Sequence, residues 1–469
     1  QKAIQNHNTF QSNIDYEALL EYFTFQNIFT DKTFVKSIKC FPAGNHATIS
    51  TQNPSSTLSL TQYWDFHFEE PTNPKAEEDY IEELKYLFNK AVKRQLVSDV
   101  EIGTYLSGGM DSGAITAIAA NDLPYIKTFT CGFDTRTAQG IELGFDEREK
   151  SEYMSHLFKT EHYEIVLKAG DMERCLPKLT YHLEEPRVGQ CYPNFYIAQL
   201  ASKFVKVCLS GAGGDELWGG YPWRYYRAVV NNNFEDYIDK YYKFWHRLIP
   251  NKEIKNVFSP IWNEVKHVWT RDIFRDVFKS HSDQLTTPED YVNHSLYFET
   301  KTFLHGLLIV EDKMSMAHSL ETRVPFLDND LVDFAMKVPV KYKLGNLRKV
   351  VKINENTPGP KTQQYFKKTR DGKLLLRKTM KQYIPKEVTD LEKQGFSAPD
   401  QTWFKKDSYD YIQERIYNPN SKLYDILDYK STTKLVDEHI NGEHNRRLFI
   451  WGLLNVGEIL NSVKGQKTW

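Results

Sequence analysis

A glycine-rich heptapeptide, Ser107–Gly113 (SGGMDSG), combines residue types that suit a phosphate ligand. Glycines at 108 and 109 would let the backbone wrap an anion, and the free N–H groups of a following helix would face it. Ser107 and Ser112 would add hydroxyl donors. Asp111 would repel a bare phosphate, so its carboxylate indicates a Mg²⁺ ion that bridges phosphate oxygens. A Gly-Gly turn alone would be an ordinary connection, but the serines and the aspartate favour a binding loop.

A second stretch of the same kind, Ser210–Asp215 (SGAGGD), follows an apolar run at 205–209. Gly211 would permit close approach to a nucleotide, and Asp215 would be another magnesium ligand. A turn with a helix cap at Asp215 would explain one acid and some glycines. It would not explain why two such loops each end a strand, so we expect the two loops to form one site.

The elements that must position these loops form an alternating pattern of strands and helices. Strands are predicted at 100–105, 126–133 and 205–209, and helices at 76–97 and 114–120. This alternation predicts a doubly wound α/β fold, with a mostly parallel sheet covered by helices on both faces. Ligands of such sheets bind at the carboxyl ends of the strands.

The remaining segments are predicted to surround this core. Residues 223–298 are rich in aromatic side chains at helical spacing, residues 300–335 and 373–383 are helix-like, and 354–368 is a polar loop. We therefore divide the chain into a connecting or lid segment at 1–75, a nucleotide-binding core at 76–222, an inserted helical lobe at 223–298, and a C-terminal helical part at 299–469 that completes the site.

Composition narrows the class of protein. A chain of 469 residues exceeds one ordinary core, since a domain holds about 100 to 200 residues. With 60 basic and 62 acidic residues, bulk charge gives no reason to expect a nucleic-acid or membrane partner. The five cysteines lie far apart without a CxxC pair, which argues against a disulfide framework or a structural zinc site. With no signal sequence and no apolar run of about 18 residues, we expect a cytoplasmic protein.

The loop LSGGMDS at 106–112 lacks the lysine of a P-loop and resembles the loop of the N-type ATP pyrophosphatases, whose fold is adenine nucleotide alpha hydrolase-like. Together with SGAGGDELWGGY at 210–221, RVPFLD at 323–328 and KQGF at 393–396, it is similar to the synthetase domain of glutamine-hydrolysing asparagine synthetases. This resemblance spans most of the chain.

The resemblance implies an ATP-dependent ligase that adenylates a carboxylate and transfers ammonia to the acyl-AMP, releasing AMP and pyrophosphate. It implies ATP and Mg²⁺ as cofactors, with Asp111 and Asp215 holding the metal. Asp215, Lys373 and Lys393 are the predicted catalytic residues, since the two lysines match family lysines near the phosphates. The residues implied around the nucleotide are Leu106, Ser107, Gly108, Gly109, Asp111, Ser112, Cys131, Ser210 and Gly211.

Ala212 departs from the family pattern SGEGxDE, in which a glutamate works as a base. Either another acid, such as Glu311 or Glu216, supplies the base, or the substrates differ, as in the β-lactam-forming and lasso-peptide-forming relatives. We favour aspartate, giving asparagine, with a sugar uronic acid or a specialised-metabolite acid as the alternative. For Arg323, a structural ion pair with Glu321 and a contact to a substrate carboxylate stay open.

Family members carry an amino-terminal glutaminase domain that supplies ammonia. The sequence starts with Gln1 near the family's connector, so we expect a glutaminase domain upstream of this chain or supplied to it. A homodimer is compatible with the resemblance. A tRNA-modifying ATP pyrophosphatase would predict a basic face, and a degenerate nucleotide-binding scaffold would not need Asp111, Asp215 and Lys373.

Overall fold

The computed structural model describes residues 1–11, 13–52, 58–189, 191–281, 285–354, 369–391 and 395–462. Its centre is a parallel five-stranded sheet in the order β5-β4-β3-β6-β7. The strands are β3 (Ile102–Tyr105), β4 (Lys127–Phe133), β5 (Glu161–Leu167), β6 (Val207–Leu209) and β7 (Glu321–Arg323). Along the chain, β4 and β5 are added on one side of β3, and β6 and β7 are then added on its other side. The strand order therefore reverses between β3 and β6, which is the switch point where doubly wound sheets bind ligands.

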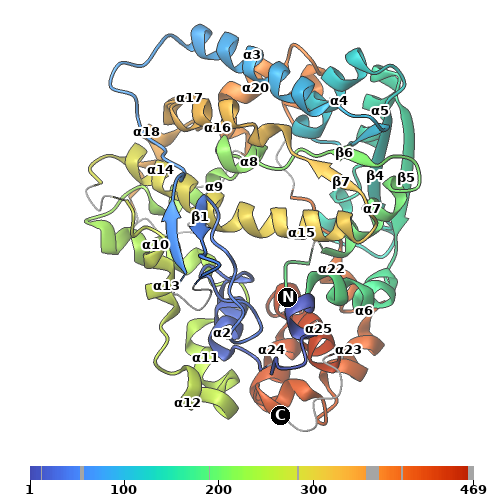
Figure 1. Cartoon of the computed structure of the whole chain (residues 1–469), viewed down its shortest axis with the longest axis vertical. Coiled ribbons are helices and arrows are strands. Elements are labelled where there is room, and N and C mark those ends of the chain that lie inside the picture. Colours follow the sequence, from blue (N-terminus) through green and yellow to red (C-terminus); the bar gives the residue numbers. More distant parts are fainter. Residues whose placement is uncertain are drawn as a thin grey trace.

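Helices cover both faces of this sheet (Figure 1). On one face, α4 (Met110–Asp122) and α5 (Arg148–Phe158) connect successive strands, and α3 (Glu77–Gln95) and α20 (Leu374–Met380) pack against α4. On the other face lie α6 (Asp171–Leu183), α7 (Cys191–Ala201) and α15 (His305–Met316). The doubly wound α/β fold is confirmed.

Strand β6 shows how this arrangement divides the interior into two cores. Val207 and Leu209 join the core that contains the buried faces of α3 and α4. Cys208, between them, joins the core that contains α6 and α7. Successive side chains of a strand point to opposite faces, so each sheet face needs its own apolar layer.

The strands and helices predicted around the two loops are confirmed within a few residues, with α4 beginning already at Met110. The helix-like interpretation of 300–335 is wrong in part, because α15 ends at Met316 and the chain then extends into β7. β5 was not predicted either. The polar loop predicted at 354–368 lies almost entirely outside the described residues.

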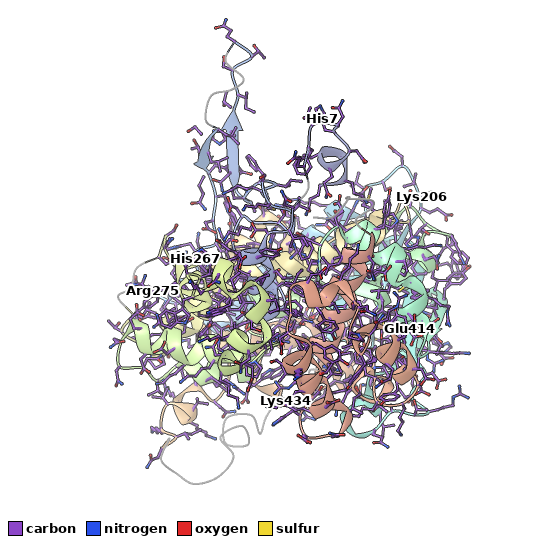
Figure 2. The ribbon with its side chains drawn as sticks, turned by 90° about the horizontal axis from the view of Figure 1, so that it is seen from below. His7, Lys206, His267, Arg275, Glu414 and Lys434 are labelled. Carbon is purple, nitrogen blue, oxygen red and sulfur yellow. The ribbon has the colours of Figure 1, made fainter. Side chains whose placement is uncertain are left out.

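The amino-terminal segment joins the body through one buried helix. In α2 (Tyr16–Phe25) the carboxylate of Asp15 accepts hydrogen bonds from the N–H groups of Glu17 and Ala18, both at 3.0 Å, which caps the helix. The short α1 (Lys2–Gln5) precedes it. The antiparallel hairpin of β1 (Asn45–Thr48) and β2 (Ser59–Gln62) stands out from the body of the molecule (Figure 2).

The aromatic-rich part of the chain folds into helices whose rings are core, not surface. Tyr241 lies 5.5 to 6.2 Å from the rings of Trp245, Phe274 and Phe298. These helices are α9 (Pro222–Tyr225), α10 (Phe234–Trp245), α11 (Asn251–Val257), α12 (Trp262–Val265), α13 (Thr270–Asp276) and α14 (Pro288–Phe298). The domain boundaries at 75, 222 and 298 stay predictions.

The last part of the described chain is helical as well. Its helices are α16 (Asn329–Met336), α17 (Val340–Lys343), α18 (Leu347–Val350), α20, α21 (Lys386–Thr389), α22 (Asp400–Trp403), α23 (Tyr409–Ile416), α24 (Tyr429–Ile440) and α25 (Arg447–Ser462). Within the described ranges, none of the helices combines the length and the apolar composition needed to cross a membrane.

Candidate active site

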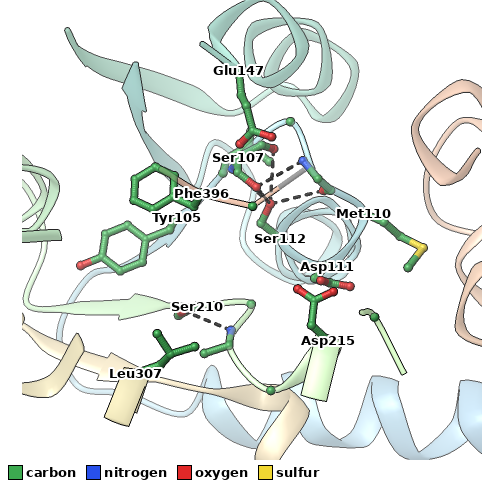
Figure 3. A pocket seen from close by; sticks show the side chains of 18 of the residues that line it. Tyr105, Ser107, Met110, Asp111, Ser112, Glu147, Ser210, Asp215, Leu307 and Phe396 are labelled. Atoms are coloured by element: carbon green, nitrogen blue, oxygen red, sulfur yellow. Dashed lines mark hydrogen bonds between the residues drawn. The ribbon is translucent and has the colours of Figure 1, made fainter. Parts of the chain in front are cut away.

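A cavity of about 370 Å³ opens where β3 and β6 end (Figure 3). Its wall contains the loop that follows β3 and the loop that follows β6. β4, α7, α15 and α20 complete it, so the lining runs in sequence from Tyr105 to Phe396. The cavity therefore occupies the switch point of the sheet, as the alternating pattern predicts.

The loop after β3 is held in one conformation by its own serines. The Ser107 and Ser112 hydroxyl groups are hydrogen-bonded at 2.9 Å, and the Ser107 N–H donates to Ser112 Oγ at 3.0 Å. The Gly109 N–H donates to Ser107 Oγ at 3.2 Å. Gly109 is the N-cap of α4 and no side chain caps this helix, so its first N–H groups are left for an anion.

An aspartate from each of the two loops forms an ion pair with the same lysine. Lys373 Nζ lies 2.5 Å from Asp111 Oδ2 and 2.6 Å from Asp215 Oδ1. The lysine side chain is 5% exposed, and those of Asp111 and Asp215 are 16% and 12% exposed. Figure 3 shows the two aspartate side chains turned toward each other. The three groups together carry one net negative charge.

Two glycines leave room for the carboxylates of Asp111 and Asp215. A Cβ at Gly214 would lie 2.9 Å from Asp111 Cγ, and a Cβ at Gly220 would lie 2.1 Å from Asp215 Oδ1. Both distances are shorter than a Cβ tolerates, so any larger residue would push a loop or a carboxylate away. The glycines after β6 thus set how closely the two loops approach.

The structure places almost every predicted site residue in this one wall. The wall contains Leu106, Ser107, Gly108, Gly109, Asp111, Ser112, Cys131, Ser210, Gly211, Asp215 and Lys373. Burial raises the pKa of the Cys131 thiol, which therefore stays neutral and acts as a small apolar surface. Lys393 lies outside the described residues.

Two further acidic residues, Glu311 and Glu216, line the same cavity as Ala212. Burial raises the pKa of Glu311 to about 7, while a hydrogen bond from the Ser210 hydroxyl opposes the shift. Burial, together with the charge of Asp215, raises the pKa of Glu216 to about 7 as well. The Tyr221 hydroxyl donates to Glu216 Oε1 at 3.0 Å.

The cavity also contains charged residues that the sequence patterns did not identify. Arg377 follows Lys373 by one helical turn in α20, and this spacing could have indicated it. Glu147 and Lys150 lie at and just after the start of α5, with no motif around them. Arg224 is buried, with an ion pair of 2.7 Å to Glu299.

Arg323 is absent from this lining and has structural partners. Its Nε donates to Glu321 Oε1 at 2.7 Å. Its Nη1 donates to the carbonyl oxygens of Gln95 at 2.7 Å and Val97 at 2.8 Å. Of the two alternatives for Arg323, the structural ion pair is the one observed, and the hydrogen bonds to the two carbonyl oxygens join β7 to the end of α3.

Comparison with known proteins gives matches over most of the chain. The family described as Asparagine synthase matches residues 83–462. The glutamine-hydrolyzing asparagine synthetase 1 of Bacillus subtilis is 27% identical over 473 residues, covering 94% of this chain and 68% of the relative. Amidase chyE of Penicillium rubens is 21% identical, covering 87% of this chain and 65% of the relative. The chain thus spans about two thirds of the length of both relatives.

Among solved structures, the U34-tRNA thiolase NcsA from Methanococcus maripaludis aligns with 54% of this chain and 84% of its own. The sequence identity is 13% and the TM-score is 0.23. A likeness at that level says nothing about the function of this chain.

Proposed function

Because the chain belongs to the asparagine synthase family, we propose that it activates aspartate with ATP and converts it to asparagine with ammonia. The coarser activity follows from the family: the chain is an ATP-dependent, amide-forming ligase. The observation that carries the proposal is the meeting of Asp111 and Asp215, from two separate loops, on Lys373 at the switch point of the sheet.

In the first step, the substrate carboxylate attacks the α-phosphate of ATP and pyrophosphate leaves. The N–H groups at the start of α4 and the loop around Ser107 and Ser112 would bind the phosphates. Lys373 would stabilise the negative charge that grows on the leaving pyrophosphate, and Lys393 would assist it. Leu106 and Cys131 would form the apolar surface against the adenosine. Ser210 and Gly211 would close the other side of the nucleotide.

The aspartate pair fits a Mg²⁺ ion that arrives with the nucleotide. Asp111 Oδ1 is buried and, among the described residues, has no hydrogen-bond partner. The net negative charge around Lys373 would repel phosphate unless a cation were added. The described part of the chain contains no cluster of three His, Cys, Asp or Glu residues that could hold a metal alone. Mg²⁺ often uses one or two carboxylates and completes its shell with phosphate oxygens, so Asp111 and Asp215 suffice.

In the second step, ammonia attacks the carbonyl carbon of the acyl-AMP and AMP leaves. The Bacillus subtilis relative is named a glutamine-hydrolyzing enzyme. We therefore also propose that a glutaminase unit provides the ammonia to this chain.

Ala212 favours a second candidate substrate. The residue that acts as base in the family pattern is absent from the loop after β6, so the reacting groups need not be those of asparagine synthesis. The alternative is amidation of another carboxylate, either a sugar uronic acid or a specialised-metabolite acid.

The test is to incubate the chain with ATP, Mg²⁺ and ammonium chloride, adding aspartate or one of a panel of acids that includes uronic acids. Formation of AMP and asparagine that requires aspartate is expected, and Asp111→Ala should abolish it. AMP formation with another acid but not with aspartate would establish the alternative. No AMP with any acid, from folded protein that binds ATP, would contradict the proposed function.

A further inference from the structure

The loop after β6 lacks a base, but a carboxyl group from another element reaches the same wall. Phe303, Leu307 and Glu311 follow one another at four-residue steps, so they share a face of the helical run that ends in α15. All three line the cavity. α15 crosses the middle of the molecule between the sheet and the aromatic-rich helices (Figure 1).

Ser210 connects Glu311 to position 212. The Ser210 hydroxyl oxygen accepts a hydrogen bond from the Ala212 N–H at 3.3 Å (Figure 3). The Ser210 side chain also contacts Glu311, where its hydrogen bonding lowers the pKa of the carboxyl group against the effect of burial. The Glu311 carboxylate is thus separated from the backbone of position 212 by a single hydroxyl group.

The surroundings of Glu311 leave its carboxylate able to accept a proton. The titratable neighbours on the sheet are Tyr105 and Cys208, and burial raises the pKa of both groups, so both stay neutral. α7 packs against α15 and faces the cavity with Asn194, Ile197 and Ala198, none of which titrates. Burial is the main cause of the raised pKa of the Glu311 carboxyl group, because it disfavours the charged form.

We propose that Glu311 is the general base of the amide-forming step and does the work that a glutamate at position 212 would do. This inference rests on the proposed function. As ammonia attacks the acyl-AMP, the N–C bond forms, one N–H proton moves to a Glu311 carboxylate oxygen, and the C–O bond to AMP breaks. AMP leaves with the electron pair of that bond. The products are the amide, AMP and protonated Glu311, which returns its proton to water.

The acidity of Glu311 suits this task. Its pKa of about 7 lies near the working pH, where a base both exists in its ionised form and binds a proton effectively. Glu216 is the weaker candidate on geometry, since the Tyr221 hydroxyl already occupies its Oε1 and its backbone follows directly on Asp215.

Separate measurement of the two half-reactions distinguishes a base that acts in the amide-forming step from a residue that acts in adenylation. Exchange of labelled pyrophosphate into ATP reports adenylation alone, and amide formation from ammonium chloride reports both steps. For Glu311→Gln, we expect exchange within about 3-fold of the wild type and amide formation slower by about 100-fold or more, the usual contribution of a general base. Asp312→Asn, an exposed neighbour on the same helix, is the matched control and should change neither rate.

A pH profile provides the second readout. The ratio of wild-type to Glu311→Gln amide-forming rates should grow as the pH rises through about 7, because only the wild type gains a carboxylate there. Ammonia protonation affects both proteins equally and cancels in this ratio.

Three results would overturn or limit the inference. Amide formation by Glu311→Gln at the wild-type rate, with exchange intact, would overturn it while leaving the proposed function standing. Loss of both half-reactions would also overturn it, because Glu311 would then serve adenylation or folding. If the wild type exchanged no pyrophosphate into ATP with any acid, the proposed function would be contradicted, and so would the role of Glu311 that depends on it.

Discussion

Lys373 is the residue on which the two loops depend. It is the N-cap of α20, with a left-handed backbone (φ 57°), and its N–H donates to the Trp218 carbonyl at 3.1 Å. A residue other than glycine costs roughly 1 kcal/mol or more in this conformation, so the surrounding contacts must impose it. The backbone conformation directs the side chain to two carboxylates that would otherwise repel each other across a distance of a few ångströms.

We predict that Lys373→Met destabilises the chain and slows adenylation. Removing one partner of a buried ion pair leaves uncompensated charge and costs roughly 3 kcal/mol. Loss of the cation opposite the pyrophosphate should slow ATP–pyrophosphate exchange by about 100-fold. Urea denaturation and the exchange assay measure the two effects.

Lys378→Met is the control for this substitution. Lys378 lies on the same helix, half exposed, and pairs with Glu77 at the surface. An exposed pair contributes about 0 to 1 kcal/mol, so stability and exchange should stay near those of the wild type. Equal effects of the two substitutions would contradict the role assigned to Lys373.

At the scale of elements, the site depends on how closely the loops after β3 and β6 pack. Gly214 is the first residue of α8 (Gly214–Leu217), and the carboxylate of Asp111, at the start of α4, lies against it. The contact joins two helix starts that lie far apart in the sequence. Strands β3 and β6 bring them together because they are neighbours in the sheet, paired at Ile102 with Val207.

We predict that Gly214→Ala disrupts adenylation more than it disrupts folding. The new methyl group would lie 2.9 Å from Asp111 Cγ, so the carboxylate or the loop must move. Overpacking of this kind costs roughly 1 to 3 kcal/mol, and a displacement of about 1 Å at a reacting centre can reduce the rate by about 100-fold.

Gly457→Ala supplies the comparison. Gly457 lies in α25, where its new methyl group would meet the Leu423 side chain at an ordinary 3.4 Å, and alanine favours a helix. Exchange activity should be unchanged and thermal stability equal or higher. Wild-type exchange by Gly214→Ala would show that the close approach of the loops is not needed.

At the scale of the whole molecule, the cavity connects parts of the chain that belong to both cores. Met110, Leu217 and Leu376 are in one core, while Phe129 and Ile197 are in the other. Elements from both are next to the cavity, so a ligand bound there should stabilise the chain as a whole.

We predict that ATP raises the melting temperature only when Mg²⁺ is present. At a ligand concentration of 100 times the Kd, binding adds about 2.7 kcal/mol to the stability of the folded state. Asp111→Asn should lose the part of the shift that depends on Mg²⁺ while keeping the fold. Differential scanning fluorimetry with ATP, in Mg²⁺ or in EDTA, measures the effect, and an equal shift in both buffers would argue against a metal held by Asp111 and Asp215.

Local sequence patterns were enough to predict the parts of the site whose residues are contiguous. Ser107–Gly113 could be predicted to lie between a strand and a helix start because strand, glycines and helix start follow one another, and a local pattern is enough to specify them. The alternation of strands and helices likewise indicated the sheet and the edge at which the loops lie.

Contacts between residues that are distant in the sequence could not be predicted in this way. Lys373 and Asp111 are 262 residues apart, and nothing in either local pattern specifies that they touch. β7 is three residues long and pairs with β6, and Arg323 at its end donates to the carbonyl oxygens of Gln95 and Val97, more than 220 residues earlier in the chain. The contact of Glu311 with Ser210 has the same origin, since packing of α15 on the sheet selects which acid reaches the loop where Ala212 has none. Long-range packing energies, not neighbouring residues, determine such contacts, so the sequence alone left Glu311 and Glu216 as open alternatives for the base.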